Sequence, residues 1–174
     1  VANEQIKIHG NTSNVYDILA LCDEYKPFLA TFDSLQAISE GSGMNNEAVA
    51  KVITQYCKRT KMISIIISHL TKDLSIKGGT GAPHYVDTIC MYEPFIPSMD
   101  GNPNELFGSK VAREIEWSGD MEEKIPKLRV LVGGAHGKNR YGDIDQKAYF
   151  LTGDDGELVL LRKKPKVIPF GSRD

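Results

Sequence analysis

The chain has 174 residues, of which 41% are hydrophobic and 25% charged, a composition typical of a folded globular domain rather than a disordered or fibrous protein. Lys and Arg total 21 and Asp and Glu total 23, so the net charge of −2 excludes a uniformly basic protein that coats nucleic acid or membrane by bulk charge. The apolar stretch from Met62 to Ile67 is far shorter than the roughly 20 residues that a membrane span needs. We therefore expect one domain and no membrane partner, and any contact with nucleic acid would have to be local.

The start of the chain and its cysteines predict a cytoplasmic location. Val1 is not an initiator Met, and no charged-then-apolar signal region follows it, so we expect this chain to be part of a longer polypeptide. Cys22, Cys57 and Cys90 are odd in number, widely spaced and surrounded by apolar residues. This usage favours buried thiols in a reducing cytosol over a disulfide framework.

The first part of the chain alternates predicted strands and helices. In chain order we expect a strand over 5–8, a helix from a cap within 12–14 to a point before Pro27, and a buried strand over 28–32. A loop over 39–46 and a second amphipathic helix through 49–56 follow. The next element is a strand over 62–68 that is covered on both faces. Three strands that alternate with two helices indicate right-handed βαβ crossovers and a mainly parallel sheet.

The rest of the chain reads as β-rich. We expect a loop over 71–84, a strand over 85–92, a loop or insertion over 94–108, short strands over 111–117, 128–132, 146–151 and 157–161, and an exposed tail over 162–174. The last two strands should form a hairpin, because the turn from Gly153 to Gly156 joins them. The predicted fold class is therefore α/β, with an antiparallel β-rich C-terminal part.

Asp33 and Ser34 directly follow the apolar strand over 28–32, and His69 follows the strand over 62–68. In a parallel sheet the carboxyl ends of neighbouring strands share one edge, where ligands bind, so Asp33 and His69 are expected to lie together. An aspartate at that position can hold Mg²⁺ through its water shell. Taken alone, such an aspartate is more often a turn former or helix cap, and a lone histidine is more often structural.

Four segments together resemble the RadA/Sms family of the RecA superfamily. They are 26–36 (KPFLATFDSLQ), 68–73 (SHLTKD), 86–88 (VDT) and 138–142 (KNRYG), in the order and at roughly the spacing of that family. The Lys-Asn-Arg-aromatic-Gly run is the most specific of them. The resemblance covers about residues 5–160 and implies a RecA-like ATPase core with ATP and Mg²⁺ as cofactors. It makes residues 1–161 a partial core, with a β-rich insertion at about 94–126 and a tail at 162–174.

The chain departs from that family in its phosphate-binding loop. A P-loop needs Gly-x-x-x-x-Gly-Lys-Ser/Thr, and no such motif is present. The run over 133–139 (GGAHGKN) has one spacer residue too few and ends in Asn. In the family, the P-loop and the catalytic glutamate precede the strand over 5–8. Either this chain is the C-terminal part of an ATPase core, or its parent protein has lost the site. In both cases we expect that the chain by itself does not hydrolyse ATP.

The segment over 71–84 is a candidate DNA-binding loop. Lys72 and Lys77 supply positive charge beside Gly78 and Gly79, and a flexible basic loop can order on a phosphate backbone. The run over 78–81 (GGTG) also resembles the second DNA-binding loop of RecA-type recombinases. Without the resemblance, an ordinary solvated loop would be the better interpretation.

Lys138 and Arg140 alternate along an extended segment, so both side chains can point the same way across Asn139. An isolated pair of this kind is ordinarily a solvated turn. The resemblance to RadA and RecA implies instead that both residues lie at a subunit interface, bind the nucleotide of the neighbouring protomer and assist its hydrolysis. It likewise implies that Asp33 and Ser34 bind the nucleotide, that Asp33 is the metal ligand, and that His69 is catalytic.

Two hypotheses of different class follow from these features. In the first, the chain is part of a DNA-dependent ATPase of the RadA/RecA type, active in recombination and repair through branch migration or strand exchange. Its partners would be single-stranded or branched DNA and further copies of itself in a ring or filament. In the second, it is a non-catalytic RecA-like paralogue that acts as a scaffold or recombination mediator.

Overall fold

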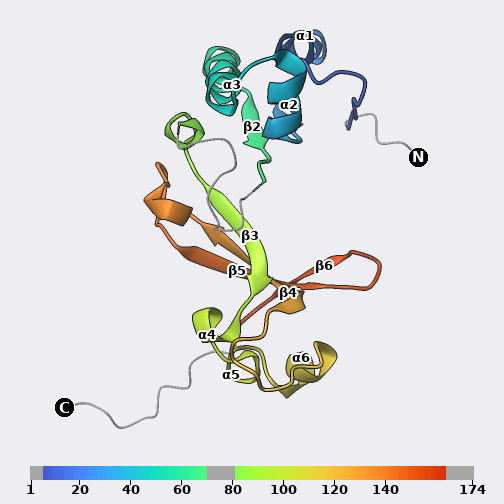
Figure 1. The fold of residues 1–174 in the computed structure, drawn as a ribbon, viewed down its shortest axis with the longest axis vertical. Helices are drawn as coiled ribbons and strands as arrows, with labels where there is room; N and C mark the ends of the chain where they lie inside the picture. Colours follow the sequence, from blue (N-terminus) through green and yellow to red (C-terminus); the bar gives the residue numbers. More distant parts are fainter. Residues whose placement is uncertain (1–5, 70–80, 164–174) are drawn as a thin grey trace, which may run out of the picture. The chain divides into compact units, whose positions relative to one another are not determined.

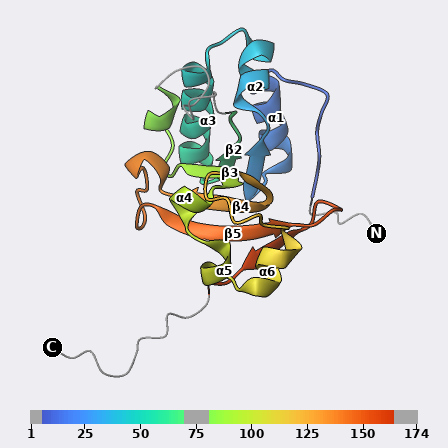
Figure 2. The same cartoon turned by 60° about the horizontal axis from the view of Figure 1, so that its bottom comes forward.

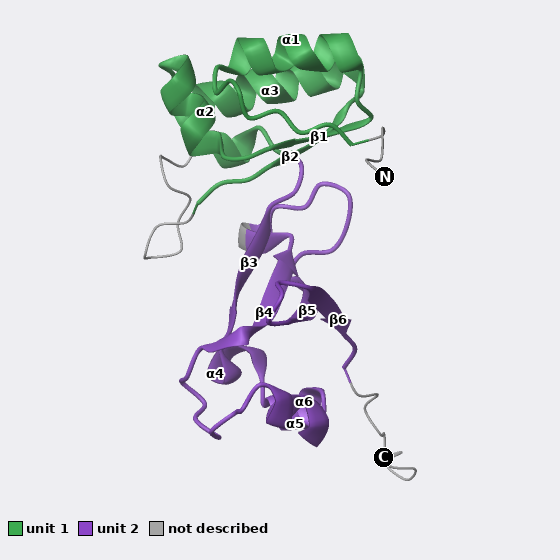
Figure 3. Cartoon of the chain, turned by 90° about the vertical axis from the view of Figure 1, so that its right-hand side faces the viewer, with its two compact units in different colours: residues 1–86 green, residues 87–174 purple. Residues whose placement is uncertain are grey.

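Two separate sheets organise the chain, one parallel and one antiparallel. The computed structural model describes residues 6–69 and 81–163 (Figure 1). A two-stranded parallel sheet belongs to the first of two compact units, residues 1–86, and a four-stranded antiparallel sheet to the second, residues 87–174 (Figure 3). The fold is therefore mixed α/β, and each unit is described by itself below.

Over residues 6–69 and 81–86, the first unit, called unit 1, consists of three helices, a parallel strand pair and a short 3₁₀ turn. Its elements are α1 (Val15–Tyr25), β1 (Leu29–Phe32), α2 (Leu35–Ser42), α3 (Asn46–Thr60), β2 (Ile63–Ile66) and η1 (Ala82–His84). Asn14 caps α1, since its side chain accepts a hydrogen bond from the Tyr16 backbone N–H at 2.9 Å. Asn45 caps α3 in the same way through the Ala48 N–H. The predicted helices before Pro27 and through 49–56 are confirmed.

The helices of unit 1 lie against one face of its sheet (Figure 3). The apolar faces of the helices and the inward side of the strands form the core, whose fully buried members include Val15, Val49 and Ile53. On the opposite face Leu29, Ile63 and Ile65 are about half exposed, at 47%, 49% and 49%. The expectation that the strand over 62–68 is covered on both faces is therefore wrong for unit 1 as described.

Two further expectations for unit 1 are corrected. Residues 6–8 form no strand, and Ile6 and Ile8 are 69% and 92% exposed. The predicted loop over 39–46 begins inside α2, which runs to Ser42. Serine hydroxyls in α2 donate hydrogen bonds to backbone carbonyls one turn earlier in the helix. Ser39 Oγ, for example, donates to the Leu35 carbonyl at 2.7 Å.

The second unit, called unit 2, is built on a meander of antiparallel strands. Its elements are β3 (Cys90–Phe95), α4 (Pro97–Asp100), α5 (Pro103–Leu106), α6 (Ser109–Glu114), β4 (Ile125–Gly133), η2 (Ala135–Gly137), β5 (Gln146–Thr152) and β6 (Leu158–Leu161). The strand order is β3-β4-β5-β6, and all three pairings are antiparallel. The predicted strands over 128–132, 146–151 and 157–161 are confirmed. The predicted hairpin is confirmed too, since the Gly153 N–H donates to the Glu157 carbonyl at 2.8 Å.

Short helices replace the expected β structure in the middle of unit 2. Residues 111–117 contain most of α6 instead of a strand, and the region 94–126, expected to be a β-rich insertion, holds α4, α5 and α6. The strand predicted over 85–92 begins only at Cys90. Helices α5 and α6 lie side by side (Figure 2). Phe107 and Ile115 pack with Phe95 and Tyr149 in the core of this unit.

An ion pair ties α4 to the sheet of unit 2. The Lys147 ammonium on β5 lies 2.6 Å from the Asp100 carboxylate, whose side chain is only 6% exposed. Asp100 also accepts a hydrogen bond from the Ile96 N–H at 3.0 Å, so its second oxygen closes the turn before α4. These contacts fix the start of the helical segment against the strands.

The helices and cysteines of the described residues bear on two further expectations. None of the helices there is long and apolar enough to cross a membrane. All three cysteines are free, but only Cys22 is buried; Cys57 is intermediate and Cys90 is exposed. The expectation that all three are buried thiols is therefore corrected for Cys57 and Cys90.

Candidate functional site

The carboxyl ends of β1 and β2 form one edge of the parallel sheet in unit 1. The strands pair in register, with Phe32 opposite Ile66, and the Ile67 N–H donates to the Phe32 carbonyl at 2.9 Å. Asp33 and His69 follow the two strands, and both side chains are exposed. The prediction that they lie at the same sheet edge is confirmed by this pairing.

Gln36, in the first turn of α2, joins the segments that follow the two strands. Its Nε2 donates to Ser68 Oγ at 2.8 Å, and its Oε1 accepts from the His69 backbone N–H at 3.3 Å. The Leu35 N–H donates to the Ile67 carbonyl at 2.8 Å. No motif in the sequence marks Gln36 as a site residue, although it lies in the segment 26–36 that carries the family resemblance. These bonds hold the backbone before His69 against the start of α2.

Ser34 and Asp33 take different positions at this edge. Ser34 is buried and caps α2, since its Oγ accepts from the Ala37 N–H at 3.4 Å. Asp33 leaves its carboxylate in solvent, beside the helix N-terminus. No cluster of three or more His, Cys, Asp or Glu side chains that could hold a metal occurs within 6–69 and 81–163. A lone exposed carboxylate fits a Mg²⁺ ion that keeps most of its waters and takes further oxygens from a phosphate ligand.

In unit 2, the segment over 138–142 lies against the segment that precedes β3. Thr88 and Asn139 form an antiparallel bridge, and the Ile89 N–H donates to the Lys138 carbonyl at 3.1 Å. The Arg140 N–H donates to the Asp87 carbonyl at 3.0 Å. Two of the four family-like segments, 86–88 and 138–142, are therefore neighbours in space.

Asn139 shapes the loop that carries Lys138 and Arg140. Its Nδ2 donates to the Asp143 carbonyl at 2.7 Å, and its Oδ1 accepts from the Tyr141 N–H at 3.2 Å and from the Thr88 hydroxyl at 3.1 Å. An asparagine at this position can make these bonds at once because its amide both donates and accepts. Asn139 thus positions the two cationic residues on either side of it.

Gly134→Ala should destabilise this loop by about 1–3 kcal/mol. Gly134 has a φ of +75°, and an added Cβ would lie 2.7 Å from Ile144 Cα and 3.1 Å from the Asp143 carbonyl oxygen. Gly137 is the matched control, because its φ of +70° is similar but nothing lies within 4 Å of the added Cβ. Urea unfolding of both variants separates the steric cost from the backbone cost. An equal loss of stability in the two would contradict the close approach.

Arg140 is held by a carboxylate of its own unit. Its Nη1 lies 2.5 Å from Asp87 Oδ1, while the Arg140 and Asp87 side chains are 49% and 38% exposed. Ion pairs exposed to this extent contribute about 0–1 kcal/mol, so a phosphate can compete with Asp87 for the guanidinium. Lys138, two residues earlier, is half-buried. The loop therefore presents two cations, one of them oriented by Asp87.

The predicted DNA-binding residues cannot be placed. Lys72, Lys77, Gly78 and Gly79 lie outside the described residues. The 3₁₀ turn η1 follows this segment, where Tyr85 Oη donates to Glu47 Oε1 at 3.5 Å. The assignment of the loop to DNA binding stays a prediction.

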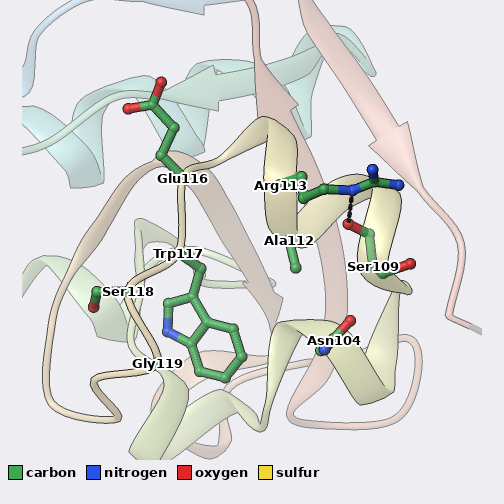
Figure 4. A pocket seen from close by; sticks show the side chains of 8 residues that line it. All are labelled: Asn104, Ser109, Ala112, Arg113, Glu116, Trp117, Ser118 and Gly119. Carbon is green, nitrogen blue, oxygen red and sulfur yellow. Dashed lines mark hydrogen bonds between the residues drawn. The ribbon is translucent and has the colours of Figure 1, made fainter.

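Two open hollows lie on the surface of the described residues, one in each unit. In unit 2 an open depression of about 580 Å³ is formed largely by α6 and the segment after it, where Arg113 Nε donates to the Ser109 carbonyl at 3.2 Å (Figure 4). Trp117 lines the same depression and donates through Nε1 to the Asp120 carbonyl. A second hollow, of about 650 Å³, lies between α1 and α3 in unit 1. Among the predicted site residues that the structure describes, none lines either hollow.

Comparison with known proteins finds relatives of one kind. The chain is 31% identical over 100 residues to the DNA repair protein RadA of Aquifex aeolicus, an alignment of 53% of this chain and 22% of the relative. It is 25% identical over 151 residues to RadA of Mycobacterium tuberculosis, covering 83% of this chain and 25% of the relative. For RadA of Haemophilus influenzae the identity is 30% over 98 residues, or 52% and 21% of the two chains. No family model matches.

These matches show a RadA-like relationship at the level of the family. The chain spans about a fifth to a quarter of the length of the relatives it matches. The matches to RadA proteins confirm the family resemblance of the four sequence segments.

Proposed function

From this relationship to the RadA family, we propose that the chain serves in DNA repair and recombination as part of a cytoplasmic DNA-dependent ATPase. Its substrates would be ATP with Mg²⁺ and single-stranded or branched DNA, and its reaction would drive branch migration or strand exchange. The ATP would be bound between subunits of a ring or filament. The relationship to proteins named for DNA repair supports the role, and it extends over up to 83% of the chain.

One observation carries the ATP-binding part of the proposal, namely the position of Asp33 at the carboxyl edge of a parallel strand pair. In open α/β sheets ligands bind outside this edge. Bound Mg²⁺ would neutralise charge on the β- and γ-phosphates. Asp33 would accept hydrogen bonds from the waters of that ion and fix its position, and Ser34 would hold Asp33 in place by capping α2.

Lys138 and Arg140 would act on the same reaction from another copy of the chain. A cation that a neighbour supplies stabilises the negative charge that develops on the transferred phosphoryl group. Asp87 supports this role for Arg140, because its carboxylate orients the guanidinium before any ligand is bound. His69 would relay DNA binding to the metal edge, since it lies between that edge and the segment over 70–80 in the sequence.

The experiment that tests the proposal measures ATP hydrolysis by the complete protein that carries this sequence. We expect turnover that requires Mg²⁺ and rises when single-stranded DNA is added. The 174-residue chain alone should give no turnover, because its sequence has no P-loop to position the phosphates. DNA binding without any ATP turnover by the complete protein would favour the alternative, a non-catalytic scaffold or mediator.

Lys72→Ala and Lys77→Ala should each weaken binding of single-stranded DNA to a similar extent for every sequence tested. Contacts to backbone phosphates carry no base information directly. Each substitution that removes a phosphate contact should make the slope of log affinity against log salt concentration shallower by about 0.7. The control is Lys51→Ala, which removes an exposed lysine from α3. An unchanged slope in the two loop variants would mean that this loop does not contact DNA.

A further inference from the structure

The strand β6 forms an unprotected edge of the sheet in unit 2. Among the described strands it pairs with β5 alone (Figure 3). Its residues Leu158, Val159 and Leu160 are 51%, 47% and 59% exposed. An exposed apolar edge strand is a template for pairing with another strand.

The opposite edge of the same sheet is protected. Strand β3 contains Pro94, which has no backbone N–H, and its register with β4 shifts between Pro94 and Phe95. Proline and bulges are the devices by which sheets block edge-to-edge pairing. Between Leu158 and Leu161, β6 has neither a charge nor a proline nor a register shift. The β3 edge therefore carries features that oppose pairing at Pro94, whereas the β6 edge carries none between Leu158 and Leu161.

The hairpin geometry shows which backbone groups of β6 are available. The Gly153 N–H donates to the Glu157 carbonyl, so these two residues form a hydrogen-bonded pair across the hairpin. Hydrogen-bonded and non-hydrogen-bonded pairs alternate along an antiparallel ladder. Leu158 and Leu160 therefore form non-hydrogen-bonded pairs with β5. Their backbone N–H and C=O groups point away from β5, toward the open edge of the sheet.

The charges that flank β6 favour one kind of strand, in one direction, as its pairing partner. Glu157 precedes the strand, and Arg162 and Lys163 follow it. An antiparallel copy of the same segment places the acidic end of each strand opposite the basic end of the other. A parallel copy would instead align like charges, which is unfavourable across a strand pair. The segment is thus complementary to itself in the antiparallel direction.

We propose that two copies of this chain associate through antiparallel pairing of β6 with β6, about a two-fold axis at Leu160. In this register Leu160 faces its own counterpart, and Glu157 faces Lys163 of the second copy. The outward backbone groups of Leu158 and Leu160 are satisfied by the second strand. Because the same strand pairs with itself about a two-fold axis, the contact is isologous and closes as a dimer. This contact is independent of the proposed ATP site.

The first test is a charge exchange followed by sedimentation equilibrium of the 174-residue chain. The wild type should show a monomer–dimer equilibrium. Glu157→Lys and Lys163→Glu should each weaken dimerisation about tenfold, since either change opposes like charges at two symmetric positions. The double variant Glu157→Lys/Lys163→Glu should restore it. Lys110→Glu, an exposed change on α6, is the control and should leave the dimer unchanged.

The second test places a charge at the proposed two-fold axis, at Leu160. Leu160→Lys should abolish the dimer by placing two ammonium groups opposite each other, while Met99→Lys, at a residue that is 68% exposed on α4, should not. Thermal unfolding of both variants checks that the monomer stays folded. A wild type that is monomeric at every concentration, single charge changes without effect, or a double variant that is not restored would each overturn the proposal.

Discussion

Asp33→Ala in the complete protein should abolish Mg²⁺-dependent ATP turnover and should affect nucleotide binding much less. The carboxylate follows β1 at the sheet edge where a parallel α/β sheet binds its ligands. Positioning and charge neutralisation by the metal provide most of the catalysis of phosphoryl transfer, so loss of the metal-positioning group should lower the rate by about 10² or more. Steady-state hydrolysis and binding of a fluorescent nucleotide separate the two effects.

The control for this variant is Glu40→Ala, which removes an exposed carboxylate from α2 in the same unit. It changes the net charge by the same amount but lies away from the strand ends. We expect it to retain the wild-type rate. Unchanged turnover in Asp33→Ala would mean that Asp33 is only a residue that ends a strand, and the proposed metal edge would be wrong.

Lys138→Ala and Arg140→Ala should each retain nucleotide binding and lose hydrolysis. Cations supplied by a neighbouring subunit accelerate phosphoryl transfer by about 10³–10⁵ in other systems, and we expect a loss of that order for Arg140→Ala. The ion pair with Asp87 is exposed enough that its loss should cost no more than about 1 kcal/mol of stability. The protein should therefore stay folded after the substitution, while its rate of ATP hydrolysis falls.

Asp87→Ala is the matched control for Arg140, because it breaks the same ion pair and leaves the guanidinium in place. If Arg140 acts on the phosphoryl group, Asp87→Ala should lose only the part of the turnover that depends on orientation of the guanidinium, and it should retain more turnover than Arg140→Ala. An equal loss in both variants would contradict a direct role of Arg140 in hydrolysis.

Features with local causes could be predicted from the sequence. Helix α1 begins at an Asn cap and ends before Pro27, and both signals lie within a few residues of the helix itself. The β5–β6 hairpin follows from a Gly-rich turn between two apolar runs. The shared strand edge of Asp33 and His69 was also predictable, because parallel pairing alone brings such residues together.

Helices α2 and α6 could not be predicted from their patterns. The polar residues of α2 read as a loop, but Ser42 Oγ accepts from the Val15 N–H at 2.8 Å, a contact between helices that no local signal reveals. An added Cβ on Gly41 would overlap the Ser13 side chain, so this glycine permits a close approach. Val111 in α6 and Ile115 directly after the helix are four residues apart, and this spacing fits a helical face as well as a strand.

The contacts that shape the candidate site also could not be predicted from the sequence. Gln36 bonds to Ser68 and His69 across the strand ends, and Asp87 pairs with Arg140 from a distant segment. Each partner lies within a segment that carries the family resemblance, but which residues within those segments bond to each other depends on tertiary packing. Sequence spacing gives no information on such pairs.

The proposed ATP site is shared between subunits, with Asp33 supplied by one copy and Lys138 and Arg140 by its neighbour. The measurement that tests it most directly mixes inactive Asp33→Ala subunits with inactive Arg140→Ala subunits in one assembly and follows ATP hydrolysis. Some interfaces then combine an intact Asp33 with an intact Arg140, so activity should partly return. No recovery in assemblies that are shown to be mixed would contradict the shared site.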